Sequence, residues 1–510
     1  MNWKLYIVAL FLFSSCGKFL DDYSQDLVIP KSVQDFDEIL LGNGYLPRKE
    51  VANLNGGGLG WFLQILDDDS NTVLEATAIK GVTEMERSYF GYFAWQFETG
   101  RTFNGLDVTP DNGTWDELYQ RINSLNIVLS EIDNMPQDHQ NDRESAARIK
   151  GEALFLRAQF YLTLVNLYAD AYAPSTAASK LGVPLKLTPF VEHDNTKESQ
   201  FERAPLNLVY QQIIQDLEQS VSSFEQTTQA KPTYRASKEA SMLLLSRVNL
   251  YMQNWEDSAN WGEKVLESNN TLLNYASIGT SDVVINEENP EIIFTQSALN
   301  LQNAFTARAG DFCVTDELYS SYAEDDYRKD LFFEKSTITD SVAIARKFRK
   351  EIHISGVSDL FLLRTSEVYL NIIEALVMSD QLNEANTMLN TFRSYRMASV
   401  PVIASDKAVL LEEIRNERRK ELCFEGHRWF DLRRYATIEQ FAYKKDIIHV
   451  FNAYDWNDRN RAVKTVVYKL NQDDLAYTFA IPKSVLEFDR SMPNNPREGR
   501  KSILEIPFNH

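Results

Sequence analysis

The segment from Ile414 to Tyr435, IRNERRKELCFEGHRWFDLRRY, constrains the fold most, because half of its residues are charged while apolar residues recur at helical intervals. Glu417, Glu421 and Glu425 are four residues apart and fall on one helical stripe, where like charges repel unless cations neutralise them. We therefore expect a buried network of carboxylates and guanidinium groups in place of a solvated charge run. Gly426 predicts the end of the helix. Candidate cations on the same segment are Arg418, Arg428, Arg433 and Arg434.

Much of the remaining chain has the periodicity of amphipathic helices. From Trp115 to Ile132, and again from Glu144 to Tyr168, apolar residues recur at spacings of three and four. Pro136 lies in the connection, so these two helices should form an antiparallel hairpin. Further helices are predicted over Leu206–Phe224, Ser237–Met252, Trp255–Leu266, Asp359–Met378 and Leu382–Tyr395.

Two of the predicted turns share a spacing. Asn254 precedes Ala259 by five residues, and Asp380 precedes Ala385 by five. A small residue one turn into the second helix allows two helices to approach closely, as in tetratricopeptide hairpins. The expected fold is therefore all-α, a scaffold of tetratricopeptide-like helical hairpins interrupted by long irregular insertions.

The first residues have the features of a lipoprotein signal peptide. Lys4 precedes an apolar run from Leu5 to Phe13, and Ser14 and Ser15 stand ahead of Cys16. The run is too short to span a bilayer as a helix. We expect residues 1–15 to be removed, Cys16 to be lipidated, and residues 16–510 to form the mature domain. A plain secretory signal with an incidental Cys16 is the alternative.

Composition and motifs argue against several classes of function. The formal net charge of −21 disfavours nucleic acid, which needs a basic face. The six histidines have no metal-binding spacing, and no nucleophile elbow or phosphate-binding loop is present. Asp67, Asp69 and Asn71 match the first three ligands of an EF-hand, but Thr72 and Ala78 break the pattern, leaving only a looser calcium site open. We therefore expect no enzyme, no cofactor and no metal. A surface hydrolase is the less favoured alternative, because 73 acids offer too many candidate pairs to select a catalytic one.

The 414–435 segment also resembles a known signature. Its string ER.KEL.FEG.RWFDLRRY is similar to the C-terminal motif of the SusD/RagB family of nutrient-binding outer-membrane lipoproteins. Other family motifs are matched in the same order along the chain, by residues 115–129, 152–170, 235–259, 362–375, 479–482 and 493–496. The resemblance covers nearly the whole chain and implies a tetratricopeptide-like scaffold. It also implies a role at the cell surface, where a captured oligomer is passed to a SusC-like TonB-dependent transporter.

The candidate ligand site lies in an aromatic segment. Eight aromatic residues fall between Tyr89 and Trp115, interleaved with polar ones. Flat rings suit the apolar faces of sugars, and polar side chains can hydrogen-bond the hydroxyls, although the same surface would also hold a peptide. Oligosaccharide is the leading ligand class, and oligopeptide stays open. The chosen ligand residues are Asp68, Tyr92, Trp95, Phe97, Arg101 and Asn112, with Phe312, Tyr319 and Tyr322 as weaker candidates.

Overall fold

The computed structural model describes most of the chain. The described residues are 30–47, 59–74, 86, 89–105, 113–189, 201–279, 282–296, 305, 312–336, 341–344, 346–350, 353–354, 356–401, 406–455, 457–458 and 461–508. The predicted signal peptide, Cys16 and Asn112 lie outside them.

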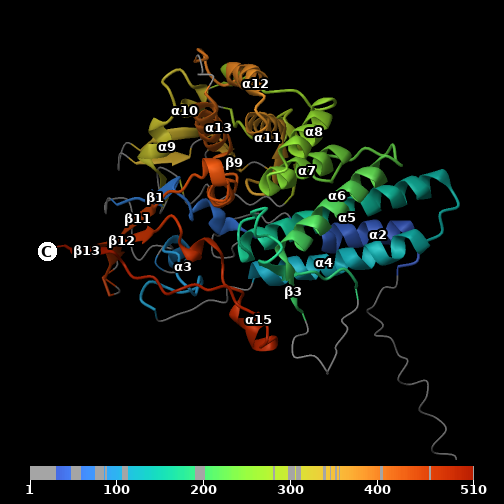
Figure 1. Cartoon of the computed structure of the whole chain (residues 1–510), viewed down its shortest axis with the longest axis horizontal. Coiled ribbons are helices and arrows are strands. Elements are labelled where there is room, and N and C mark those ends of the chain that lie inside the picture. Colours follow the sequence, from blue (N-terminus) through green and yellow to red (C-terminus); the bar gives the residue numbers. More distant parts are fainter. Residues whose placement is uncertain are drawn as a thin grey trace, which may run out of the picture.

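Helices dominate the described chain (Figure 1). They are α2 (Val33–Ile39), α3 (Phe90–Phe93), α4 (Gly113–Glu131), α5 (Gln140–Tyr168), α6 (Leu206–Phe224), α7 (Lys238–Met252), α8 (Trp255–Leu266), α9 (Asp316–Ser320), α10 (Tyr327–Phe332), α11 (Thr365–Met378), α12 (Leu382–Ser394), α13 (Lys407–Leu422), α14 (Arg428–Tyr435) and α15 (Lys483–Phe488). Every helix predicted from periodicity is confirmed, and Leu206–Phe224 and Trp255–Leu266 have the predicted bounds. Helix α11 begins six residues later than predicted, because Leu362–Arg364 form a strand.

The helices pack as consecutive antiparallel neighbours, α4 on α5, α5 on α6 and α7 on α8, with α11 against α8 and α12. The α7–α8 and α11–α12 turns each use a non-glycine residue in the left-handed region, Gln253 (φ 65°) and Asp380 (φ 62°). Ala259 and Ala385 are both buried. Their role as the small residues of tetratricopeptide-like hairpins stays a prediction.

Small antiparallel sheets complete the fold, so the all-α prediction is corrected to a mostly helical fold with sheets. Strands β11 (Ile447–Tyr454), β12 (Ala462–Leu470) and β13 (Leu504–Pro507) form one sheet. Another has the order β1 (Ser70–Thr72), β5 (Phe312–Val314), β7 (Val342–Ile344), β6 (Phe333–Lys335). Two-stranded pairs are β2 (Leu181–Pro184) with β3 (Arg203–Pro205), β4 (Ile292–Thr295) with β10 (Leu362–Arg364), and β8 (Arg349–Lys350) with β9 (His353–Ile354). Most of these strands have two to four residues, too few for a period of two to be readable.

The charged signature segment is buried, as predicted, and forms α13, a turn and α14. Helix α13 ends at Leu422, and Phe424 (φ 59°) and Gly426 (φ 76°) make the turn. A Cβ on Gly426 would lie 2.9 Å from the Leu360 side chain, so the close approach also favours glycine. Glu425 therefore lies in the turn and not on the helical stripe.

Glu421 is the centre of a buried ion network. Its Oε1 lies 2.7 Å from Arg364 Nη1 and its Oε2 lies 3.1 Å from Arg328 Nη1 and 3.0 Å from Arg396 Nε. All four side chains are at most 1% exposed. Burial by itself would raise the pKa of Glu421, but the three arginines hold it well below its usual value.

The network is balanced in charge. Arg328 and Arg393 also bind Glu417, and Arg364 and Lys347 bind Glu425. The carboxylates at its centre are Asp326, Glu291, Glu417, Glu421 and Glu425, and the cations there are Arg328, Lys347, Arg364, Arg393 and Arg396. At its edge Lys420 lies 3.7 Å from Glu417 and Glu413 lies 2.8 Å from Arg393, which keeps the balance. The predicted network is confirmed, but its cations come mainly from residues 328–396, and the signature itself contributes Lys420.

The signature arginines have other partners. Arg418 and Arg434 bind Asp431, and Arg434 also binds Glu374. Arg428 binds Asp68. Arg433 donates to the carbonyl oxygens of Asn166 and Ala169 at the end of α5, where a cation is favoured by the helix dipole. The segment thus ties α5, α11 and the loop before β1 together.

Candidate functional site

The structure places Trp95 inside the core, which corrects the prediction that its ring is a ligand platform. The side chain has no exposed surface. Its ring stacks on His449 at 4.3 Å, and its indole N–H donates to the Leu66 carbonyl oxygen at 2.9 Å. The backbone φ of 48° is unusual for a bulky residue and is maintained by these contacts. Trp95 is therefore a packing residue in this structure.

Other aromatic residues predicted to contact the ligand also pack against the protein itself. Tyr92 is half-buried and stacks on Phe62 with ring centres 4.4 Å apart. Phe312 and Tyr322 are buried, and Tyr319 is half-buried. Core packing thus accounts for Phe312 and Tyr322, because aromatic side chains provide much of the apolar area that a core of this size needs.

Phe97 and Arg101 lie at the surface. Phe97 is 40% exposed. Arg101 is exposed and lies 3.6 Å from Glu98. These two residues remain available to a ligand, whereas Asn112 lies outside the described residues.

Asp68 is buried in a second ion cluster, which does not suit it as a ligand contact. Its carboxylate accepts from Arg428 at 2.7 and 2.9 Å and from Lys445 at 2.7 Å, and Arg419 lies 3.1 Å away. Burial opposes ionisation, but Arg428 and Arg419 hold the pKa of Asp68 well below its usual value. The prediction that Asp68 contacts the ligand is therefore not supported by its position.

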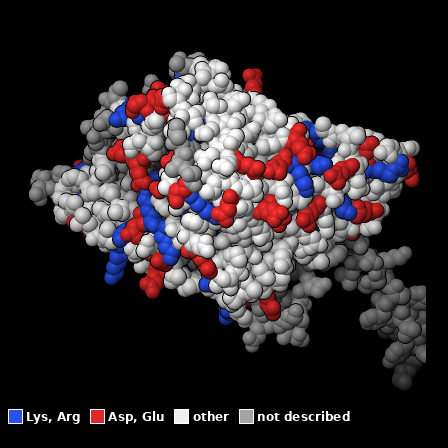
Figure 2. Space-filling view, turned by 45° about the horizontal axis from the view of Figure 1, so that its top comes forward, with Lys and Arg blue, Asp and Glu red and all other residues white. Residues whose placement is uncertain are grey.

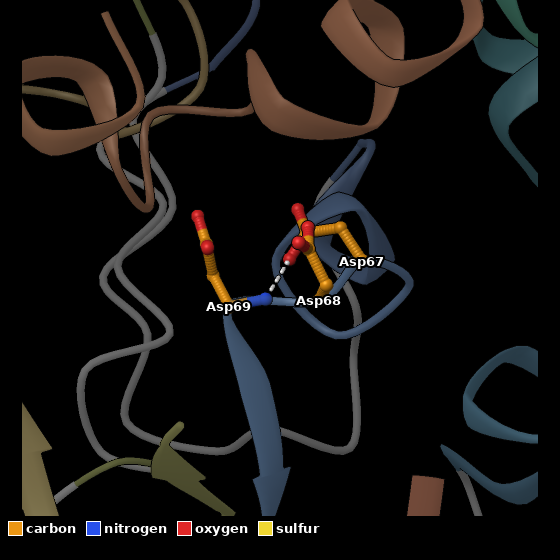
Figure 3. A group of neighbouring side chains, drawn as sticks. All are labelled: Asp67, Asp68 and Asp69. Atoms are coloured by element: carbon orange, nitrogen blue, oxygen red, sulfur yellow. Dashed lines mark hydrogen bonds between the residues drawn. The ribbon is translucent and has the colours of Figure 1, made fainter. Parts of the chain in front are cut away.

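Asp67 and Asp69 flank Asp68 in this cluster (Figure 3). The Asp69 amide N–H donates to the Asp67 carboxylate at 3.0 Å, and Asp69 Oδ1 lies 2.6 Å from Arg419 Nε. Burial, together with the charges of Asp69 and Asp68, raises the pKa of Asp67 well above its usual value. Because Arg419, Arg428 and Lys445 already balance the negative charge, the residues present do not fit a divalent cation. Asn71, the third matched EF-hand position, instead pairs with the backbone of β11.

A cleft that sequence reasoning missed has the character of a ligand site. It has a volume of about 580 Å³ and is lined by residues of α4, the β2–β3 region and α15. Figure 1 shows where α4, β3 and α15 lie in the fold. We call it the aromatic cleft, and its apolar lining is Trp115, Tyr119, Pro184, Phe201, Val485, Phe488 and Met492. Gln120, Asn123 and Ser484 add polar groups to the lining.

The fixed rings of the aromatic cleft are held by the scaffold. Tyr119 donates its hydroxyl to the Pro184 carbonyl oxygen at 2.8 Å, and Trp115 packs edge-on against Tyr168 at 5.0 Å. Phe488 is 72% exposed. Within the described part of the chain, the buried Oδ1 of Asn123 has no hydrogen-bond partner. The cleft therefore offers flat apolar surfaces together with hydrogen-bonding groups.

A signal for this cleft existed in the sequence but was weak. Trp115 begins the helix predicted over Trp115–Ile132 and falls on its buried face, and Phe488 stands alone between Glu487 and Asp489. A large apolar residue between two acids in a short helix is a reason to expect exposure. That the three residues share one cleft follows only from the tertiary fold.

Two family models match the chain. One, described as "Starch-binding associating with outer membrane", matches residues 63–250, and the model of the SusD family matches residues 345–497. The chain belongs to the SusD/RagB family. A SusD-like protein from Formosa agariphila is 24% identical over 300 residues, which are 58% of this chain and 51% of that protein. The chain thus matches about half the length of this curated relative.

Solved structures share the fold of this SusD/RagB member. A SusD-like carbohydrate binding protein from Bacteroides vulgatus has a TM-score of 0.69 at 21% identity, covering 91% of this chain and 98% of that chain. A SusD superfamily protein from Bacteroides thetaiotaomicron has a TM-score of 0.67 at 20% identity, covering 91% and 100%. Among the helices of the described residues, none is long and apolar enough to cross a membrane.

Proposed function

We propose that this protein is a cell-surface lipoprotein that captures an oligosaccharide in the aromatic cleft and delivers it to a SusC-like TonB-dependent transporter of the outer membrane. The aromatic cleft is the observation that carries the proposal. Tyr119 is half-buried and fixed by the scaffold, Trp115 adds the 6% of its surface that is exposed, and Phe488 is largely exposed, an arrangement that suits a sugar with apolar ring faces. Family membership supports the role of a binding protein and not of an enzyme.

The anchoring and scaffold parts of the proposal rest on the sequence. Lipidation of Cys16 would attach the mature domain, residues 16–510, to the membrane through several acyl chains, which is enough for stable anchoring. The α7–α8 and α11–α12 hairpins, with their matching turns, support a tetratricopeptide-like scaffold.

Oligopeptide is the second candidate ligand class. An extended peptide would use the same rings for its side chains, while Gln120 and Asn123 could bond its amides. One of the solved structures with the same fold is a SusD-like carbohydrate binding protein, which favours sugars as the first choice.

Replacing Phe488 tests the site. We expect Phe488→Ala to weaken binding by about 1 to 3 kcal/mol, the loss of a hot-spot ring, while the exposed position leaves stability nearly unchanged. The wild type is first screened by calorimetric titration against glycan and peptide libraries. The affinities of wild type and variant are then compared for the ligand that binds.

Phe97→Ala is the matched control, because Phe97 is also an exposed phenylalanine but lies outside the aromatic cleft. Loss of affinity in Phe97→Ala with full affinity in Phe488→Ala would place the ligand site at the surface that carries Phe97 and Arg101. Binding of peptides and not of glycans would select the second ligand class.

A further inference from the structure

A second cleft lies close to the aromatic cleft. It has a volume of about 440 Å³ and is bounded by the loop after α5, the end of α14 and residues 472–478. We call it the polar cleft, because most of the residues that line it have hydrogen-bonding side chains, among them Thr176, Lys180, Lys444, Asp473, Tyr477 and Asn495.

Charges around the polar cleft are arranged in pairs of opposite sign. Lys180 lies 2.9 Å from Asp170, and Lys444 lies 2.6 Å from Asp473. Asp474 is likewise paired with Arg500, at 2.6 Å. Figure 2 shows acidic and basic side chains interleaved on one face of the molecule.

This pairing determines the class of ligand. An anion would have to break the lysine–aspartate pairs, and Arg433 is turned toward the carbonyl oxygens of Asn166 and Ala169. Neutral sugar hydroxyls both donate and accept, so they can bond the two members of such a pair without breaking it. The Tyr477 ring, stacked on Trp429 at 4.9 Å, adds a fixed apolar surface.

One chain segment contributes to both clefts. Met492 lines the aromatic cleft and Asn495 lines the polar cleft, three residues further along the chain. Three residues span at most about 11 Å. Asn495 is held firmly, because its Nδ2 donates to the Tyr168 and Phe479 carbonyl oxygens, both at 2.7 Å, and Arg203 donates to its Oδ1 at 2.9 Å.

We propose that the polar cleft is a second subsite for the same ligand, so that the protein prefers neutral oligosaccharides long enough to reach from the aromatic cleft past Asn495. The inference rests on the proposed function. It adds a dependence on chain length and assigns hydroxyl recognition to Lys444 and Asp473. Short oligomers should fill only the aromatic cleft.

The test uses the double variant Lys444→Ala with Asp473→Ala. Removing both members keeps the net charge, and an exposed pair of this kind contributes little to stability. The probes are size-fractionated oligosaccharides of two to ten units prepared from starch, xylan and mannan. The matched control is Lys464→Ala with Glu505→Ala, an exposed pair at 2.7 Å between β12 and β13, outside both clefts.

In calorimetric titration we expect the Lys444/Asp473 variant to bind long oligomers at least fivefold more weakly and short ones as the wild type does. Phe488→Ala should weaken both, and the control pair neither. Equal affinities of the Lys444/Asp473 variant and the wild type for long oligomers, with Phe488→Ala still weakened, would overturn the second subsite alone. A loss that does not depend on length would also overturn it. If none of the size-fractionated oligosaccharides binds the wild type, the proposed oligosaccharide function is refuted, and the second subsite with it.

Discussion

Replacement of Glu421 should destabilise the protein without a direct effect on ligand binding. The Glu421 carboxylate is within 3.1 Å of atoms of Arg328, Arg364 and Arg396, and all four side chains are at most 1% exposed. Glu421→Gln keeps the shape of the side chain but leaves the network with one excess positive charge. Breaking a buried network in this way costs about 3 to 5 kcal/mol, because the remaining charge is stranded.

The expected shift in melting temperature follows from chain size. At about 2.1 cal/mol/K per residue, a chain of 510 residues has an unfolding entropy of about 1 kcal/mol/K. A loss of 3 to 5 kcal/mol therefore lowers Tm by about 3 to 5 °C. Differential scanning calorimetry measures Tm, and titration at a temperature well below Tm measures the affinity of the folded fraction.

Glu413→Gln on the same helix is the matched control. Glu413 is paired with Arg393 at 2.8 Å, but its side chain is 43% exposed, so its loss should cost less than about 1 kcal/mol. The reasoning is refuted if Glu421→Gln melts like the wild type. Unchanged stability with lost affinity would instead place Glu421 in a binding role.

Three further outcomes are expected. The pKa values of Glu421 and Glu425 are lowered in the folded state, so the stability they provide is present above about pH 4.5 and is lost as pH falls below it. Tm should decline below that pH, and the same decline in Glu421→Gln as in the wild type would contradict a contribution from Glu421. Trp95→Ala should cost about 3 to 5 kcal/mol of folding stability, measured by denaturant unfolding, through the cavity left by a fully buried ring. Weakened capture with unchanged stability would return Trp95 to the ligand site. Cys16→Ala should move the protein from membranes to the soluble fraction on cell fractionation, whereas a membrane-bound variant and a wild type that takes up no labelled palmitate would disprove lipidation.

The helices could be predicted from the sequence because each depends on a local pattern of apolar residues. Apolar spacings of three and four marked Leu206–Phe224 and Trp255–Leu266 with the bounds that the structure has. The sequence also predicted that a buried charge network exists. Three glutamates four residues apart repel one another, and the large apolar residues beside them favour burial, so cationic partners are needed. Its partners were not predictable, because Arg328, Arg364 and Arg396 are 25 to 93 residues away from Glu421 in the chain.

The candidate site was predicted less well, for a physical reason. Aromatic residues serve both as core and as sugar platforms, and sequence gives no direct measure of exposure. Trp95 and Phe97 differ by two positions, yet Trp95 has no exposed surface and Phe97 is 40% exposed. The short strands β1 and β5 were missed because their pairing partners are far apart in sequence.

The sequence by itself determined the helical scaffold, the burial of the charged signature and the family, because periodicity, charge spacing and motif order are properties of neighbouring residues. Only the tertiary structure decided which cations neutralise Glu421 and which aromatic rings face a cleft. It alone brings Trp115, Phe201 and Phe488 to one surface, since these residues come from α4, the β2–β3 region and α15. Contacts between such distant segments depend on how the helices and sheets pack, and no local pattern encodes that packing.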